Sequence, residues 1–204
     1  MQRFSDDAGI AIGPILFVIA LIGIIGVVLA SGFGDFGTAS ITDRVYADVQ
    51  SQANLIRTKI NECNLKYGTN GNGDGYPLGD TTSGTLVCAL QCEGDPSTSE
   101  SGTDCAGNSL TMQNIWTGER PTSLPPPTSG FDAWRYVNDG ATHGRCIFTQ
   151  PSSTPSQGIT AALVKVASKF SSQEAVYNSA GTTGRFVVWI TLPTGSPNSN
   201  CASN

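Results

Sequence analysis

The cysteines are the residues of this sequence whose type and spacing most directly imply chemistry. There are 6 of them, and none precedes residue 63. An even number of cysteines in a loop-rich segment is typical of disulfides formed in an oxidising compartment, and free thiols are the second interpretation. A metal site is the third, but only Cys88 and Cys92 lie close together and no histidine cluster accompanies them. The disulfide candidates are Cys63, Cys88, Cys92, Cys105, Cys146 and Cys201, whose pairing the sequence leaves open.

Oxygen-bearing side chains alternate with glycine at residues 70–75 (NGNGDG), as in the first half of a calcium loop. Calcium takes about 6–8 oxygen ligands. The candidate ligands are Asn70, Asn72, Asp74 and Asp80. The aspartate that opens such a loop is missing, and Thr81 occupies the place of the closing glutamate. A plain turn of glycine and asparagine is the alternative interpretation, and no other cofactor is expected.

Groups for acid–base or nucleophilic catalysis are sparse. His143 is the single histidine and stands between threonine and glycine in a turn-like stretch, where a solvated side chain is the ordinary interpretation. The sequence contains no G-x-S-x-G, H-E-x-x-H, Walker or C-x-x-C-H motif. Trp116, Trp134 and Trp189 lie among strand-forming residues and are expected in the core. We therefore do not expect an enzyme, and a secreted enzyme that depends on His143 is the alternative.

Length and charge limit the class of protein. The chain has 204 residues, about one domain by the usual range of roughly 100–200 residues. Only 13% of its residues are charged, against about 25% in an ordinary soluble domain. Asp and Glu number 16 and Lys and Arg 11, for a net charge of −5. Because no basic stripe is present to neutralise phosphates, nucleic acid is not expected as a partner.

An uncharged, apolar segment precedes all the cysteines. Residues 10–30 read IAIGPILFVIALIGIIGVVLA, interrupted only by glycine and proline. A helix of this length rises about 30 Å, the thickness of a bilayer's hydrocarbon core, so we predict a hydrophobic transmembrane helix over residues 10–31. A removed signal peptide is the alternative, although its apolar core spans only about 7–15 residues. Because the cysteines follow the span, we expect the N-terminus in the cytoplasm and the remainder outside it.

Beyond the span, the sequence predicts an amphipathic helix and an α+β head. From Ile41 to Cys63, apolar residues recur at intervals of three or four, which predicts a helix over residues 38–67 that ends at Gly68 and covers a sheet. Its polar face carries Asp43, Arg44, Asp48, Arg57, Lys59 and Glu62. In the head, residues 68–204, short runs of β-branched and aromatic residues predict a small antiparallel sheet with disulfide-pinned loops. The predicted strands are 84–91, 131–137, 145–149 and 185–192, with a second helix over residues 158–172.

An apolar N-terminal helix, an amphipathic continuation and a small cross-linked head together resemble the type IV pilin superfamily, which includes the pseudopilins of type II secretion. The resemblance covers residues 1–67. Residues 1–9 resemble the leader that the prepilin peptidase removes after a glycine, so that cleavage would fall between Gly9 and Ile10. Residues 15–25 resemble the apolar stretch of the family.

The resemblance also implies roles for particular residues of the span. Pro14, Gly23 and Gly26 would lie at helix-packing positions. Pilins usually carry a glutamate at the fifth residue after the cleavage point, where this chain has Pro14 instead. Proline is tolerated there because the first N–H groups of a helix have no partner within it. Some pseudopilins bind calcium in the head, which bears on the loop at residues 70–75.

As a function, the resemblance implies a structural subunit held first in the inner membrane as a single-pass protein, with lipid as its neighbour. Inner-membrane assembly machinery would then pack it with copies of itself into an extracellular or periplasmic filament, leaving the head at the filament surface. The alternative is an uncleaved single-pass membrane accessory subunit with a periplasmic binding head. The mass of the mature protein distinguishes the two, because only the first loses nine residues.

Overall fold

The computed structural model of the chain describes residues 12–68, 74–92, 103–117 and 121–202, and within the first of these ranges the side chains of residues 17–23 and 39–68. The chain divides into two compact units, Met1–Ile41 and Thr42–Asn204. The boundary falls inside the first helix, α1 (Ile12–Tyr67).

The first unit contains the beginning of α1. Residues 17–23 are helical, and all of their side chains are exposed. Among the residues that the structure describes, no helix combines the length and the apolar character needed to cross a membrane. Of the span predicted over residues 10–31, residues 10–16 and 24–31 lie outside the described side chains.

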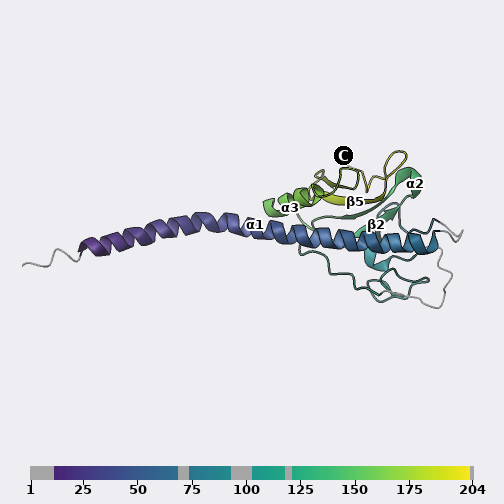
Figure 1. Ribbon diagram of the computed structural model, residues 1–204, viewed down its shortest axis with the longest axis horizontal. Helices are drawn as coiled ribbons and strands as arrows, with labels where there is room; N and C mark the ends of the chain where they lie inside the picture. The colour runs from purple at the N-terminus through teal and green to yellow at the C-terminus, as the bar shows by residue number, and fades with distance from the viewer. Residues whose placement is uncertain (1–11, 69–73, 93–102, 118–120, 203–204) are drawn as a thin grey trace, which may run out of the picture. The chain divides into compact units, whose positions relative to one another are not determined.

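The second unit is built on a five-stranded sheet (Figure 1). Its strands are β1 (Thr85–Leu86), β2 (Arg135–Asn138), β3 (Arg145–Thr149), β4 (Ala175–Asn178) and β5 (Arg185–Thr191). They are ordered β1-β2-β3-β5-β4 across the sheet, and every neighbouring pair is antiparallel. The predicted α+β class, with a small antiparallel sheet in the head, is therefore confirmed.

The second half of α1 lies across one face of the sheet with the apolar side that the sequence predicts (Figure 1). Val49, Ile56 and Ile60 are completely buried, as the helical period requires of one continuous stripe. They join a core cluster to which the sheet contributes Tyr136 and Phe186. Each fully buried aliphatic side chain of this kind contributes about 1.5–3 kcal/mol, so this stripe stabilises the attachment of α1 to the sheet.

The opposite side of the sheet, here called the second face, has a smaller core of its own. The face that α1 covers is here called the first face. Side chains alternate between the two faces of a strand, so the strand residues next to those on the first face point to the second face. Val137, Phe148 and Trp189 are buried in this cluster. Cys201, from the segment after β5, is buried among them and bonded to Cys146 of β3. The second face is therefore covered at this point by the chain's C-terminal segment.

The helix α3 (Gln157–Ala167) was predicted in the right place, but it begins one residue before the predicted range 158–172 and ends five residues before its end. Ser156 caps its N-terminus, accepting a hydrogen bond from the backbone N–H of Ile159 at 3.4 Å. Leu163 and Val166 are buried in the first-face core, as the periodicity predicts. The helix ends after Ala167, and the chain then turns into β4.

Several strand predictions also need correction. The strand predicted over residues 84–91 is shortened to β1, because the chain continues as a 3-10 helix, η1 (Val87–Ala89). The strand predicted over 131–137 begins only at Arg135; Phe131 instead forms an isolated bridge with Pro151. The strands at 145–149 and 185–192 are confirmed, the second ending one residue early. The short helix α2 (Gly140–His143) and β4 were not predicted.

Two residues of α1 differ from their predicted surroundings. Lys59, assigned to the polar face, is only 6% exposed, and its Nζ lies 2.9 Å from Oε2 of Glu62. A lysine can bury its aliphatic stem while its ammonium group meets a carboxylate, so this position is compatible with a largely covered side chain. Ile41, assigned to the apolar stripe, is 47% exposed. The helix does end at Tyr67, immediately before Gly68, as predicted.

Candidate functional site

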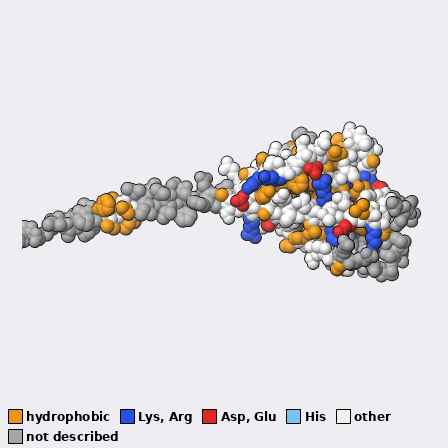
Figure 2. Space-filling model, in the orientation of Figure 1, with side chains coloured by type: hydrophobic (Ala, Val, Ile, Leu, Met, Phe, Trp, Pro, Cys, Tyr) orange, Lys and Arg blue, Asp and Glu red, His pale blue; other side chains and the backbone are white. Residues whose placement is uncertain are grey.

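Residues 17–23 of α1, here called the apolar stretch, present hydrophobic side chains to solvent. Phe17 is 68% exposed and Ile22 is 63% exposed. Val18, Ile19 and Leu21 are exposed as well. Figure 2 shows the stretch as an orange band. These side chains are therefore exposed although hydrophobic side chains are more stable when they are removed from water.

The distribution of these side chains around the helix shows what could cover them. Successive residues of an α-helix are about 100° apart, so seven of them span nearly two turns and point to all sides. A helix that packs on a globular core needs only one apolar stripe, and a helix that is apolar all round is buried in a large core or a membrane. The apolar stretch therefore suits a helix surrounded by lipid or by several other helices.

Gly23 ends the apolar stretch and lies at a helix surface with open space beside it. A Cβ atom built on this glycine would meet no other atom within 4 Å. Small residues on a helix let a second helix approach closely, so the predicted packing role of Gly23 remains compatible with its surroundings. The side chains of Pro14 and Gly26 lie outside the described residues, and so do the predicted cleavage residues Gly9 and Ile10.

The six cysteines form three disulfides, which confirms the first interpretation of their number. The pairs are Cys63–Cys92, Cys88–Cys105 and Cys146–Cys201. Their Cα atoms are 5.6, 5.4 and 5.9 Å apart, within the usual range of about 4.4–6.8 Å. The first bridge links the end of α1 to the segment that follows it, and the second closes a loop within that segment. The third links β3 to the C-terminal segment.

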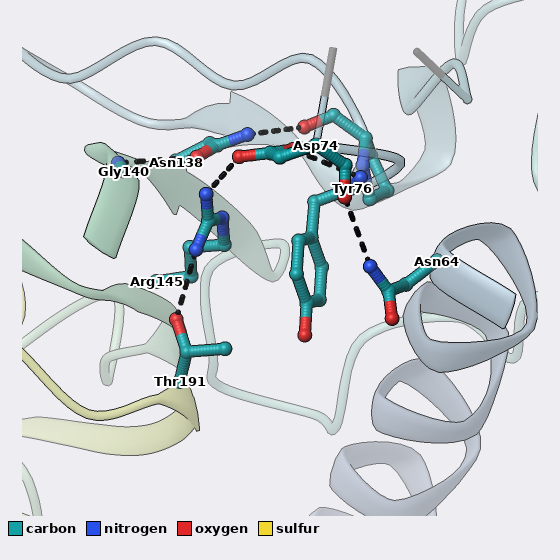
Figure 3. A network of polar contacts seen from close by, with 8 residues as sticks. Asn64, Asp74, Tyr76, Asn138, Gly140, Arg145 and Thr191 are labelled. Atoms are coloured by element: carbon teal, nitrogen blue, oxygen red, sulfur yellow. Dashed lines mark hydrogen bonds and ion pairs between the residues drawn. The ribbon is translucent and has the colours of Figure 1, made fainter. Parts of the chain in front are cut away.

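Arg145 and Asp74 form the centre of a polar network where β3 begins (Figure 3). The Arg145 side chain is only 6% exposed and forms an ion pair with the Asp74 carboxylate. Its Cζ lies 4.4 Å from the centre of the Tyr76 ring, and one terminal nitrogen donates to Oγ1 of Thr191 at 3.3 Å. Burial lowers the pKa of the Arg145 guanidinium from its ordinary value.

The same network ties the end of α1 to the segment that follows it (Figure 3). Asn64 donates from Nδ2 to the backbone carbonyl of Asp74 at 2.9 Å. The Asp74 carboxylate also accepts the backbone N–H of Tyr76 at 3.0 Å. Since both charged groups are already engaged, the network holds this segment against the sheet and offers no free acid or base. Arg145 is buried whereas the Asp74 side chain is 41% exposed, so removing Asp74 would leave a buried charge uncompensated, and the pair contributes to the local structure.

The calcium prediction falls partly outside the described residues. Asn70 and Asn72 are not described, and the carboxylate of Asp74 is bound by Arg145. Within the residues that are described, no three His, Cys, Asp or Glu side chains come together as metal ligands would. Calcium binding by the loop thus stays a prediction, and it would have to compete with the Arg145 guanidinium for Asp74.

Asp80, the fourth calcium candidate, caps a turn. Its carboxylate accepts the Ser83 hydroxyl at 2.6 Å and the backbone N–H groups of Thr82 and Ser83 at 2.8 and 3.2 Å. These hydrogen bonds, that of the Ser83 hydroxyl first, lower the pKa of the Asp80 carboxyl. In the described structure its oxygens therefore stabilise the turn before β1.

A groove of about 310 Å³ lies beside the C-terminal end of α1. The disulfide Cys63–Cys92 and Ile115 contribute to its walls, and the ion pair between Lys59 and Glu62 also borders it. Among its described lining residues, the only carboxylate is that of Glu62, and it is already paired. The groove therefore combines an apolar wall, the neutralised pair of Lys59 and Glu62, and the Lys66 side chain.

His143 and the three tryptophans have ordinary surroundings. His143 ends α2, is exposed, and has its Nδ1 2.7 Å from the backbone carbonyl of Ser196. Trp116, Trp134 and Trp189 are buried, as predicted. The Trp134 indole donates to Oε1 of Gln52 at 2.8 Å, which links the sheet to α1. The expectation that the protein is not an enzyme stays a prediction.

Comparison of the chain with protein-family models, with curated proteins and with solved structures finds no match. The resemblance to pilins therefore rests on the residues themselves. The apolar stretch of α1 lies inside residues 15–25, which carry part of this resemblance.

Sequence reasoning missed the role of Arg145. It placed this residue at the start of a predicted strand and gave it no partner, because Asp74 is 71 residues away along the chain. One signal was present in the sequence: Arg145 opens the predicted strand RCIFT, and a charge on a strand that becomes buried requires a compensating partner from elsewhere.

Proposed function

We propose that this protein is a pilin-like structural subunit that assembles into an extracellular or periplasmic filament through its apolar N-terminal helix. The observation that carries the proposal is the apolar stretch, in which every side chain from Phe17 to Leu21 is hydrophobic and exposed. A helix that is apolar on all sides is suited to lipid at one stage and to sister helices at another. The resemblance of residues 1–67 to pilins supports the same reading.

Burial of the apolar stretch favours assembly strongly relative to water but only weakly relative to lipid. Burying one large apolar side chain contributes about 1.5–3 kcal/mol relative to water, so the apolar stretch alone represents on the order of 10 kcal/mol. Lipid already satisfies this surface in the membrane, and the net gain on leaving it is small. Association of helices in or from a membrane depends instead on close packing at small residues, for which Gly23 is placed. External machinery would therefore have to drive extraction from the lipid.

The second unit has the properties expected of a head exposed outside the cytoplasm. Three disulfides cross-link it, and such bonds persist in oxidising compartments. Within this unit, the sheet packs against α1 through the buried stripe that contains Ile56. The proposed location is therefore the inner membrane before assembly, with the head outside the cytoplasm, and the filament afterwards.

Two measurements on the native protein test this proposal. Mass spectrometry of the mature chain should show loss of residues 1–9, with Ile10 as the new N-terminus. Electron microscopy of the sheared cell-surface fraction should show filaments that contain the protein. A full-length chain that retains Met1 and remains in the membrane fraction as single copies would instead establish the accessory-subunit alternative.

A matched pair of variants separates assembly from folding. Ile22→Asp places a charge in the apolar stretch and should abolish filament formation while leaving the cross-linked head folded. Leu65→Asp is the control, because Leu65 is 81% exposed on the same helix but outside the apolar stretch. It should assemble normally. Equal assembly by both variants would remove the apolar stretch from the mechanism.

A further inference from the structure

A pocket of about 230 Å³ lies on the second face of the sheet and gathers two arginines. The residues that line it and matter here are Arg135, Arg185, Asp132, Phe148, Gln150 and Asn200. They come from three parts of the chain: the neighbourhood of β2 and β3, the start of β5, and the C-terminal segment. The pocket is separate from the Asp74–Arg145 network and from the apolar stretch.

The register of the strands explains why both arginines reach this pocket. Arg135 is paired directly with Phe148 in the antiparallel ladder, and its side chain shares the second face with Val137, two residues on. Arg185 shares the same face with Val187. The Arg185 guanidinium stacks on the Phe148 ring, with Cζ 4.4 Å from the ring centre. The ring of Phe148 thus forms one side of the pocket and orients the guanidinium of Arg185.

Each arginine is fixed in place by one terminal nitrogen. Arg135 donates from NH1 to the backbone carbonyls of Ser83 and Gly84 at 3.2 and 2.9 Å. Arg185 donates from NH1 to the backbone carbonyl and to Oδ1 of Asn200, both at 3.1 Å. Neither guanidinium forms an ion pair with a carboxylate among the described residues. Both side chains are partly buried, so water solvates their charges only in part.

Among the described residues that line the pocket, Asp132 supplies the one carboxylate, and it does not balance the charge of both arginines. Asp132 accepts a hydrogen bond from Nε2 of Gln150 at 3.0 Å and is itself exposed. Two guanidinium charges and one carboxylate leave the pocket with a formal charge of +1 in a protein of net charge −5. Burial also lowers the pKa of the Arg185 guanidinium, which indicates that this charge lies in a poorly solvated place.

From this geometry we propose that the pocket between Arg135 and Arg185 binds a singly charged carboxylate. The guanidinium group offers paired N–H donors in a plane, which match the two oxygens of a carboxylate. One negative charge neutralises the pocket, whereas a doubly charged phosphate would leave it with a net charge of −1. The inference is independent of filament assembly and goes beyond it.

Titration calorimetry on the full-length chain in a nonionic detergent tests the proposal, with sodium glucuronate, inorganic phosphate and neutral glucose as probes. Glucuronate should bind at one site with saturation at millimolar concentration, and glucose should give no saturable heat. Arg135→Gln and Arg185→Gln should each weaken glucuronate binding about tenfold or more, since hydrogen bonds to charged groups are lost. Arg185→Lys, which keeps the charge but not the planar fork, should also weaken it.

The control is Arg57→Gln, because Arg57 lies on α1, is paired with Glu174 and does not line the pocket. This variant should bind glucuronate as the unaltered chain does. Absence of saturable glucuronate binding up to about 50 mM would overturn the site. Tighter binding of phosphate than of glucuronate would overturn the assignment to a carboxylate. An equal loss in Arg57→Gln would show that diffuse charge, and not the pocket, attracts the anion.

Discussion

The bridge between Cys146 and Cys201 is the cross-link whose removal perturbs the second face most. Replacing both cysteines (Cys146→Ala with Cys201→Ala) opens a loop of 55 residues. The chain-entropy description of cross-links gives roughly 4 kcal/mol of stability for a loop of this length at 25 °C. Both cysteines are completely buried in the second-face core, so the missing sulfur atoms add about 1 kcal/mol or more in lost packing. We expect the free energy of unfolding to fall by about 4–5 kcal/mol.

The matched control removes the bridge between Cys88 and Cys105, which closes only 17 residues. The same description gives roughly 3 kcal/mol for that loop. Neither of these two cysteines is among the buried residues, so little packing is lost with them. The first double variant should therefore be the less stable of the two by about 1–2 kcal/mol.

Urea unfolding of the full-length chain, followed by tryptophan fluorescence, measures both differences. The three tryptophans all lie in the second unit, so the signal reports on the cross-linked head. Midpoints should fall in the order unaltered chain, Cys88/Cys105 variant, Cys146/Cys201 variant, under the same detergent conditions. If opening the larger loop costs less than opening the smaller one, the second-face core does not depend on its C-terminal segment and the reasoning is refuted.

Three further predictions concern folding of the second unit. Ile56→Ala should destabilise it by about 2–5 kcal/mol, whereas Ile41→Ala, at an exposed position, should change the midpoint of urea unfolding very little. Gly144→Ala should lower the melting temperature in calorimetry, because Gly144 has a φ of +83° and a Cβ there would lie 2.8 Å from the Trp189 ring. The pKa of Asp80 is lowered in the folded state, so the stability that its carboxylate contributes is present above about pH 4 and is lost as the pH falls through the folded-state pKa. The variant Asp80→Asn should therefore be less stable than the unaltered chain at about pH 6. In urea titrations the two should have the same stability at about pH 2.

Periodicity predicted the parts of the fold whose patterning is local. The stripe from Val45 to Cys63 repeats at helical intervals, and it is buried because an amphipathic helix must cover its apolar side. The run at 185–191 contains Val187 and Ile190 with aromatic neighbours, so it reads as a strand without knowledge of its partners. Both signals come from one segment of sequence.

Features that depend on pairing between distant segments escaped prediction. β4 contains two strand-forming residues, Val176 and Tyr177, and becomes a strand because β5 offers it an open edge. The 3-10 helix η1 interrupts a run that sequence alone assigns to a strand throughout. A local pattern carries no information about where a neighbouring edge ends.

In the candidate site too, local features could be predicted from the sequence and contacts between distant segments could not. The apolar stretch was visible as a run of hydrophobic residues, since the property that matters is composition. The number of cysteines indicated disulfides, but their partners follow from the fold. Arg145 with Asp74, and Arg135 with Arg185, meet only because the sheet brings their segments together.

The layout of the three bridges determines how the protein behaves when its backbone is broken once. The loops closed by Cys63–Cys92 and Cys88–Cys105 overlap, so a cut anywhere between residues 63 and 105 leaves both pieces joined. A cut between Cys146 and Cys201 does the same. Such nicked molecules migrate as one band on a gel until a reducing agent is added, whereas a nick between residues 105 and 146 separates the two pieces under denaturing conditions at once.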